Sequence, residues 1–245
     1  MRRIRSAFLF LAVLVCATPS LASVVMIGTR MIYPGGARER SIQFSNPDDA
    51  PSVVQVWIDS GATDSTPETA DAPFVVTPPI FRIDPKLGQT VRVIFVDRDL
   101  PKDRESVFFI NTLQIPSLNA TELEHNKMLL LLRNRIKLFY RPEGIAGSAE
   151  NAVRQLRFSV IRDGIDWKIA ATNDSEFHIS HTAIGLSGTG GSLALAPGMI
   201  APKSTFDWRV RSEEDLASSV RSVSFKVIND HGGEVPFELR LAPGP

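Results

Sequence analysis

The residues that could do chemistry are few and scattered along the chain. There are only four histidines, and of these only His178 and His181 are close in sequence. Residues three apart on a strand point to opposite faces, and no cysteine or group of carboxylates stands beside this pair. Because a transition-metal site needs several such ligands that converge, the sequence predicts no metal site.

Signals for catalysis or cofactor binding are also missing from the sequence. No serine lies in the glycine-flanked turn that exposes a nucleophile. The glycine-rich stretch at 188–191 lacks the lysine of a phosphate-binding loop and precedes a strand-like run rather than a helix. We therefore predict a protein that is not an enzyme and needs no cofactor. A secreted, glycan-active β-sandwich enzyme stays as an alternative, and it would need a convergent pair of carboxylates that the sequence does not reveal.

The most distinctive segment is residues 127–142, which read KMLLLLRNRIKLFYRP. Positions 128–132 are all apolar, whereas a strand with one wet face would alternate. Two interpretations stay open from these residues alone. The segment is either a central strand with both faces covered, or a strand that packs one face on its own core and offers the other to a partner.

The elements around this segment are short β-type runs separated by turn residues. A Gly- and Ala-rich stretch at 141–152 divides them into two sets. No comparable stretch has a sustained helical period, and only one helical turn, at 212–218, is expected. The sequence predicts an all-β protein of two β-sandwich domains, residues 23–144 and 145–245. The predicted strands are 24–33, 41–44, 53–58, 90–96, 107–113 and 128–140, then 155–161, 167–172, 178–187, 204–210, 220–228 and 235–241.

The first 22 residues have the pattern of a secretory signal peptide. Arg2, Arg3 and Arg5 precede an apolar run at 7–15, and small residues lead to Ala22. We expect cleavage after Ala22 and export to the periplasm. No later stretch has the roughly 20 apolar residues of a membrane span, so a membrane-embedded protein is not expected.

Removal of the leader changes the cysteine content and the charge. The single cysteine is Cys16, and because Leu14 and Val15 precede it in place of small residues, a lipid anchor is not expected. The fold must therefore form without disulfides. The sequence has 27 basic and 27 acidic residues. Since three of the basic ones lie in the leader, acidic residues then outnumber basic ones, which gives no reason to expect nucleic acid as a partner.

An ordered set of motifs across the chain resembles the PapD-like periplasmic pilus-assembly chaperones. The strongest are residues 135–142 (RIKLFYRP) and 100–111 followed by Ile115 and Pro116. Each motif alone is weak, and their order and spacing together are specific. The resemblance also rests on 28–34 (GTRMIYP), 46–51 (NPDDAP), 54–57 (VQVW), 78–83, 89–93 and 228–233 (INDHGG).

This resemblance implies a fold and a function. The two domains are expected to be immunoglobulin-like sandwiches in a boomerang arrangement, with the site in the inter-domain cleft. The protein is expected to capture pilin subunits by donor-strand complementation and to pass them to an outer-membrane usher. A secreted adhesin or structural pilus component remains an alternative, although a pilin would show an incomplete domain and both halves here look complete.

The resemblance also assigns site residues. Arg30 and Lys137 are expected to bind the C-terminal carboxylate of a subunit, although each alone would be read as an exposed cation at a strand edge. Met128, Leu130 and Leu132 are expected to fill the groove of the subunit, while Leu129 and Leu131 are expected in the core. Strict alternation puts Lys137 and Leu132 on opposite faces, so the strand is expected to twist, bulge or change exposure near Asn134.

A third set of residues is expected at the domain junction. Glu105, Arg141 and Asp230 match a charged cluster of the family, and a guanidinium can serve two carboxylates at once. The connection at 117–126 is short and has no flanking cysteine pair, which resembles the branch of the family with a short F–G loop. The resemblance leaves the resting state open between a monomer and a self-capping dimer.

Overall fold

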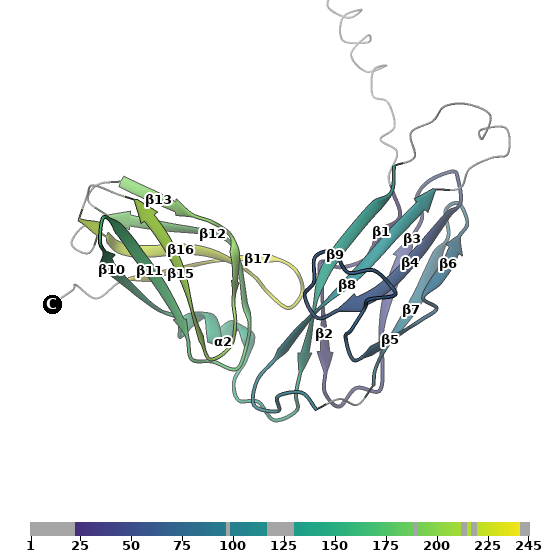
Figure 1. Cartoon of the computed structure of the whole chain (residues 1–245), viewed down its shortest axis with the longest axis horizontal. Coiled ribbons are helices and arrows are strands. Elements are labelled where there is room, and N and C mark those ends of the chain that lie inside the picture. The colour runs from purple at the N-terminus through teal and green to yellow at the C-terminus, as the bar shows by residue number, and fades with distance from the viewer. Residues whose placement is uncertain are drawn as a thin grey trace, which may run out of the picture.

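The computed structural model describes residues 23–96, 99–116, 130–188, 191–211, 215–216 and 220–240. These residues form two β-sandwiches set at an angle and joined by a short connection (Figure 1). The prediction of an all-β protein built from two sandwiches is confirmed. Within the ranges described, no helix has the length and apolar character needed to cross a membrane.

The first sandwich packs a four-stranded sheet on a five-stranded sheet. All neighbouring strands are antiparallel except β2 and β9, which run parallel. The four-stranded sheet has, in spatial order, β1 (Val25–Met26), β3 (Arg40–Ser45), β7 (Gly88–Phe95) and β5 (Phe74–Thr77). The five-stranded sheet has β2 (Arg30–Pro34), β9 (Leu132–Arg141), β8 (Ser106–Pro116), β4 (Ser52–Asp59) and β6 (Ile80–Ile83).

Side chains that alternate along these strands form the first core. Tyr33, Val91, Ile110 and Leu138 are fully buried between the two sheets. On β9 the even-numbered residues face this core, since Leu138 belongs to it and Ile136 packs against it. Odd-numbered residues of β9 therefore point to the outer face of the sheet.

The segment predicted as one strand at 24–33 is divided between the two sheets. β1 pairs with β3 in one sheet, and β2 pairs with β9 in the other. Gly28 lies between them with a φ of +107°, a conformation that only glycine adopts without strain. This break brings Arg30 into register beside β9.

The second sandwich packs a three-stranded sheet on a five-stranded sheet around Ile169, Ala171 and Val223. The three-stranded sheet has β10 (Arg157–Asp163), β11 (Asp166–Asn173) and β15 (Ser204–Arg211). The other sheet has β13 (Gly191–Leu195), β12 (Ile179–Gly188), β16 (Val220–Ile228) and β17 (Glu234–Arg240), with β14 (Gly198–Ile200) also paired to β12.

A short helix follows the connection between the domains. α2 (Ala149–Arg154) begins after Ser148, whose hydroxyl accepts a hydrogen bond from the Asn151 amide at 3.2 Å. The sequence analysis predicted no helix here. Of the helical turn predicted at 212–218, only residues 215 and 216 lie in the described part of the chain.

Candidate functional site

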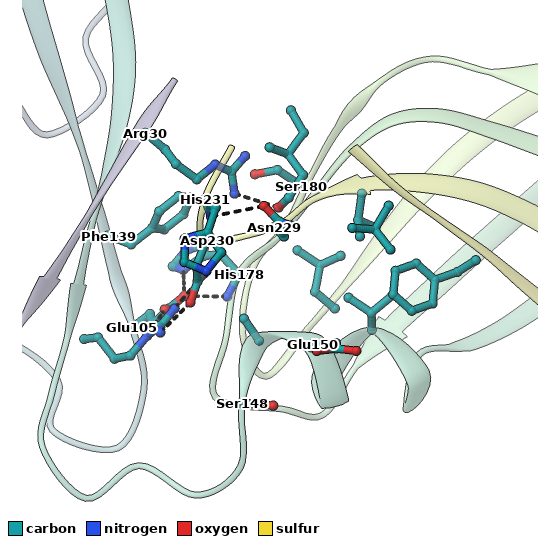
Figure 2. Close-up of a pocket in the computed structure, with 18 residues that line it drawn as sticks. Arg30, Glu105, Phe139, Ser148, Glu150, His178, Ser180, Asn229, Asp230 and His231 are labelled. Atoms are coloured by element: carbon teal, nitrogen blue, oxygen red, sulfur yellow. Dashed lines mark hydrogen bonds and ion pairs between the residues drawn. The ribbon is translucent and has the colours of Figure 1, made fainter. Parts of the chain in front are cut away.

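The two sandwiches meet at a cavity of about 340 Å³. The first domain contributes Arg30, Glu105 and Phe139, and the second contributes His178 and Asp230 (Figure 2). The cavity therefore lies where the cleft between the domains ends. Its walls are both apolar and charged, an arrangement that favours a ligand with one charged group.

Two cations stand side by side on β2 and β9 at this cleft. The parallel pairing places Arg30 directly opposite Lys137, so both side chains leave the same face of the sheet. We call these two residues the cation pair. The Arg30 guanidinium donates to the Ile228 carbonyl at 2.8 Å and lies 5.4 Å from the centre of the Phe139 ring. It therefore contacts the second domain without being neutralised there.

Burial disfavours the charge of both residues of the cation pair, and the charge of Arg30 further disfavours that of Lys137. Both residues are half-buried. Burial, followed by the charge of Arg30, lowers the pKa of Lys137 below its usual value. Burial also lowers the pKa of Arg30, against the opposing effect of Asp230 and Glu105. Among the described residues neither cation forms a salt bridge, so a carboxylate placed between them would satisfy both.

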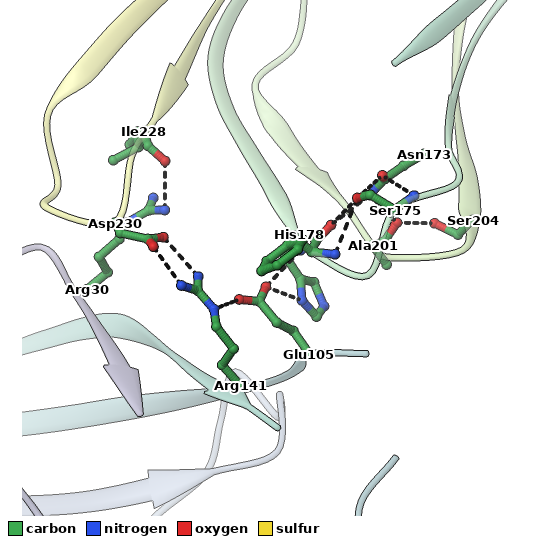
Figure 3. Close-up of polar contacts among 11 residues, drawn as sticks. Arg30, Glu105, Arg141, Asn173, Ser175, His178, Ala201, Ser204, Ile228 and Asp230 are labelled. Carbon is green, nitrogen blue, oxygen red and sulfur yellow. Dashed lines mark hydrogen bonds and ion pairs between the residues drawn. The ribbon is translucent and has the colours of Figure 1, made fainter. Parts of the chain in front are cut away.

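Arg141 contacts both Glu105 and Asp230 at the domain junction (Figure 3). We call these three residues the charged cluster. The Arg141 Nε atom donates to Glu105 at 2.7 Å, and its two terminal nitrogens donate to Asp230 at 2.7 and 3.0 Å. Burial alone would lower the pKa of Arg141, but the two carboxylates raise it above its usual value. Glu105 also accepts from the His178 backbone amide at 2.8 Å, which makes it a further direct link between the domains.

Ser180 was not found by sequence reasoning, and His181 was considered there only as a possible metal ligand. Ser180 lines the cavity, and its buried hydroxyl has no hydrogen-bond partner among the described residues. His181 is buried, and neither of its ring nitrogens has a hydrogen-bond partner among the described residues. Burial, followed by the charge of Lys137, lowers the pKa of His181 to about 4. The structure gives His178 and His181 no shared role. His178 lines the cavity, whereas His181 lies against the rings of Phe206 and Trp208. No signal in the sequence distinguishes them from ordinary strand residues.

The leucines before the cation pair are exposed to solvent. The exposed fractions are 64% for Leu130, 48% for Leu131 and 40% for Leu132. The expectation that Leu131 lies in the core is therefore wrong, because Leu131 precedes the first residue of β9 and lies beyond the end of the core. Met128 and Leu129 lie outside the described residues.

The ladder between β8 and β9 is regular. Residues 132–140 pair with 106–114 without a shift in register, so no bulge separates the leucines from the cation pair. Leu132 and Lys137 simply lie on opposite faces of one strand. What changes near Asn134 is exposure, since residues 132–134 are exposed and residues 135–137 are half-buried.

One edge of β9 is open beside these leucines. β2 pairs with β9 only from Lys137 onward, and in the described chain no strand lies along that edge at 132–136. We call residues 130–136 the open segment and residues 137–141 the closed segment. An open pocket of about 620 Å³ lies between the open segment and residues 23–29. An extended peptide placed there could pair with the main chain and present side chains to the leucines.

Comparison with known proteins identifies the fold family. Residues 23–146 match the family described as pili and flagellar-assembly chaperone, PapD N-terminal domain. Residues 151–239 match the family described as pili assembly chaperone PapD, C-terminal domain. The chain belongs to the PapD-like pilus chaperones. Both domains carry the chaperone match, which favours a chaperone over an adhesin or a structural pilus component.

Individual PapD-like chaperones are similar over nearly the whole chain. The chaperone protein FimB/FhaD of Bordetella pertussis is 34% identical, with 98% of each chain covered. YadV of Escherichia coli is described as a probable fimbrial chaperone. The crystal structure of the YadV chaperone has a TM-score of 0.75 at 33% identity, with 90% of this chain and 100% of that chain covered. A chain from the complex of the Salmonella enterica SafA pilin with the SafB chaperone has a TM-score of 0.72 at 25% identity, with 91% and 99% covered.

Proposed function

We propose that this protein captures a pilin-type subunit by donating the open segment to it. The observation that carries the proposal is the cation pair at one end of an open, leucine-bearing strand edge. The similarity to a chain of a solved pilin–chaperone complex supports the choice of partner. In this proposal the C-terminal carboxylate of the subunit binds Arg30 and Lys137, and Met128, Leu130 and Leu132 fill the groove of its incomplete sandwich.

The spacing along β9 suits this arrangement. Leu132 lies five residues before Lys137, and Leu130 lies seven residues before it. These separations correspond to about 17 and 23 Å along a strand. A subunit strand anchored at the cation pair would pair with residues 136 to 130 in order. Because the carboxylate fixes one end, it also fixes the register in which apolar residues meet the leucines.

The charged cluster has a supporting role in the proposal. Arg141 binds a carboxylate from each domain, and its pair with Glu105, which is 4% exposed, is well shielded from water, whereas the Asp230 side chain is 35% exposed. Breaking one partner of such a shielded pair is costly. We propose that the cluster holds the angle between the domains, and with it the width of the cleft around the cation pair.

The location and the later steps also belong to the proposal. Residues 1–22 would act as the signal peptide, the protein would work in the periplasm, and a loaded subunit would pass to an outer-membrane usher. Without a subunit, two copies could cover their open segments by pairing as a self-capping dimer, because exposed apolar edges favour association. No catalytic step enters this function.

Co-purification from the periplasm tests the proposal. The chain would be co-expressed with a pilin-type subunit encoded in its own genome, as wild type, as Lys137→Ala, and as Lys168→Ala for a matched control on a surface ion pair of the second domain. We expect wild type and Lys168→Ala to retain the subunit, and Lys137→Ala to lose most of it while its thermal unfolding is unchanged. Retention by a folded Lys137→Ala protein at the wild-type level would refute the anchoring role, and no retention by wild type would refute capture itself.

A further inference from the structure

A polar network is buried on the outer face of the five-stranded sheet. Asp59 and Asn111 alternate with the core residues Ile58 and Ile110, so they point away from the core. Nevertheless Asp59, Asn111 and the loop residue Ser65 are buried. The loop that follows β4 crosses this face of the sheet and covers it (Figure 1). Polar groups withdrawn from water in this way need partners.

The Asp59 carboxylate is the centre of this network. Its two oxygens accept hydrogen bonds from Ser65 and Asn111 at 2.6 Å each, from the Gly61 amide at 2.8 Å and from Arg135 at 2.6 Å. Burial alone would raise the pKa of Asp59, but these four donors lower it below its usual value. The carboxylate is thus ionised and fully paired inside the fold.

Two arginines connect the network to the open segment of β9. The Arg135 guanidinium binds Asp59 and lies 4.0 Å from the centre of the Phe109 ring. The Arg133 guanidinium donates to the Asn111 side chain at 2.7 Å and lies 5.0 Å from the centre of a Trp57 ring. Each arginine is therefore fixed by a charged or polar acceptor and by an aromatic face.

These contacts act on the part of β9 that lacks a second neighbouring strand. Residues 132–136 pair with β8 on one side only, so their backbone is less restrained than that of the closed segment. Arg133 and Arg135 are odd-numbered, whereas Leu130 and Leu132 are even-numbered. The network can therefore hold the strand from one face and leave the leucine face free.

We propose that Asp59 is a positioning residue, which holds the open segment extended and in register through Arg135 and Asn111 before a subunit binds. A strand that is already ordered loses less conformational entropy on pairing, so capture is faster and tighter than it would be with a frayed strand. The link to capture rests on the proposed function. The bracing itself is a property of the free protein and can be measured without a subunit.

The test compares three variants in the free protein by hydrogen–deuterium exchange. Arg135→Met removes the ion pair but keeps most of the stem over Phe109, Arg135→Lys keeps the charge, and Asp84→Asn removes an exposed carboxylate paired with Arg82. We expect the amides within 132–136 that bond to β8 to exchange at least about fivefold faster in Arg135→Met. Arg135→Lys should restore part of the protection, and Asp84→Asn should match wild type. Strands β3 and β7 of the same domain should be unchanged.

The same variants are then mixed with the subunit that co-purifies with wild type, and the rate of complex formation is measured. Slower capture by Arg135→Met, with partial rescue by Arg135→Lys, is the expected result. Unchanged exchange of the amides within 132–136 that bond to β8 would overturn the proposal. An equal acceleration over every strand of the first domain would also overturn it, because that result indicates a general loss of stability. Faster exchange with an unchanged capture rate would overturn its link to binding. If wild type captures no subunit, the proposed function fails. The exchange comparison alone then tests whether Asp59 holds the open segment.

Discussion

Residues 132–140 of β9 form one continuous ladder with β8, yet the open and closed segments differ in their second neighbour and in the exposure of their leucines. The closed segment has a strand on each side, and its Leu138 is fully buried. The open segment has β8 on one side only, and Leu132, six residues earlier on the same face, is 40% exposed. Because the residue type and the face are the same, the difference comes from what faces the side chain: Leu138 packs in the core between the two sheets, and Leu132 lies beyond the end of that core.

This contrast indicates two uses of one strand. Buried leucine in the closed segment stabilises the first domain through the hydrophobic effect. Exposed leucine beside an open edge gives the folded monomer no such benefit and promotes aggregation. The proposed function gives a physical reason to keep such a strand, and in that proposal the cation pair sets where binding begins.

The largest expected effect is a difference in unfolding free energy between substitutions in the closed and the open segment. Leu138→Ala should lower the free energy of unfolding of the first domain by about 3 kcal/mol, because it leaves a cavity in a closed core. Leu132→Ala should lower it by less than about 1 kcal/mol, since little packing is lost. Urea unfolding measures both when it is followed by the fluorescence of Trp57, the single tryptophan of the first domain, in a Trp167→Phe, Trp208→Phe background that silences the second domain. Similar losses in the two variants would show that the open segment is part of the core.

A second effect is a pH dependence of the unfolding free energy, which arises because Lys137 of the closed segment acts on His181 of the second domain. The charge of Lys137 contributes, after burial, to a pKa of about 4 for His181, whose ordinary value is 6.5. Above pH 6.5 the imidazole is neutral in both the folded and unfolded states, and stability is at its full value. As the pH falls from 6.5 towards 4, the unfolded state binds a proton that the folded state does not, so stability is lost.

The predicted loss is about 2 kcal/mol at pH 5 relative to neutral pH. It would be measured by urea unfolding at pH 5 and pH 7.5 in wild type and in His181→Leu. The variant should lack most of this pH dependence. An identical dependence in both proteins would assign the effect to other groups.

The smallest effect should follow from loosening the charged cluster that holds the closed segment to the second domain. Asp230→Asn removes the bidentate partner of Arg141 but leaves Glu105 in place. Because the Asp230 side chain is 35% exposed, the unfolding free energy should change by no more than about 1 kcal/mol. The distribution of domain angles, measured by small-angle X-ray scattering, should broaden. Asp207→Asn, on an exposed ion pair within the second domain, is the control and should leave it unchanged.

Much of the fold could be predicted from the sequence because strand signals are local. Runs such as 90–96 and 220–228 are rich in β-branched and aromatic residues between turn residues, and the structure has β7 and β16 there. The helix α2 could not be predicted in this way, because six residues give too little periodicity and its start depends on one capping serine. The break at Gly28 was missed because the strand signal continues through it on both sides.

The site divides along similar lines. Arg30 and Lys137 could be named because the motifs around them are specific, and their pairing then follows from the register of β2 and β9. The error at Leu131 arose because five consecutive apolar residues do not show where the core ends. The Asp59 network was missed because it joins β4, β8, β9 and a loop, and sequence spacing carries no information about such distant contacts.

The carboxylate that the cation pair is proposed to hold is the central element of the proposed function. The direct test changes the ligand: a synthetic peptide with the C-terminal strand sequence of the captured subunit, made as the free acid and as the amide, is titrated calorimetrically into wild type and Lys137→Ala. The account predicts that the amide binds wild type at least about tenfold more weakly than the acid, and that this ratio falls towards one in Lys137→Ala. Equal binding of acid and amide to wild type would contradict it.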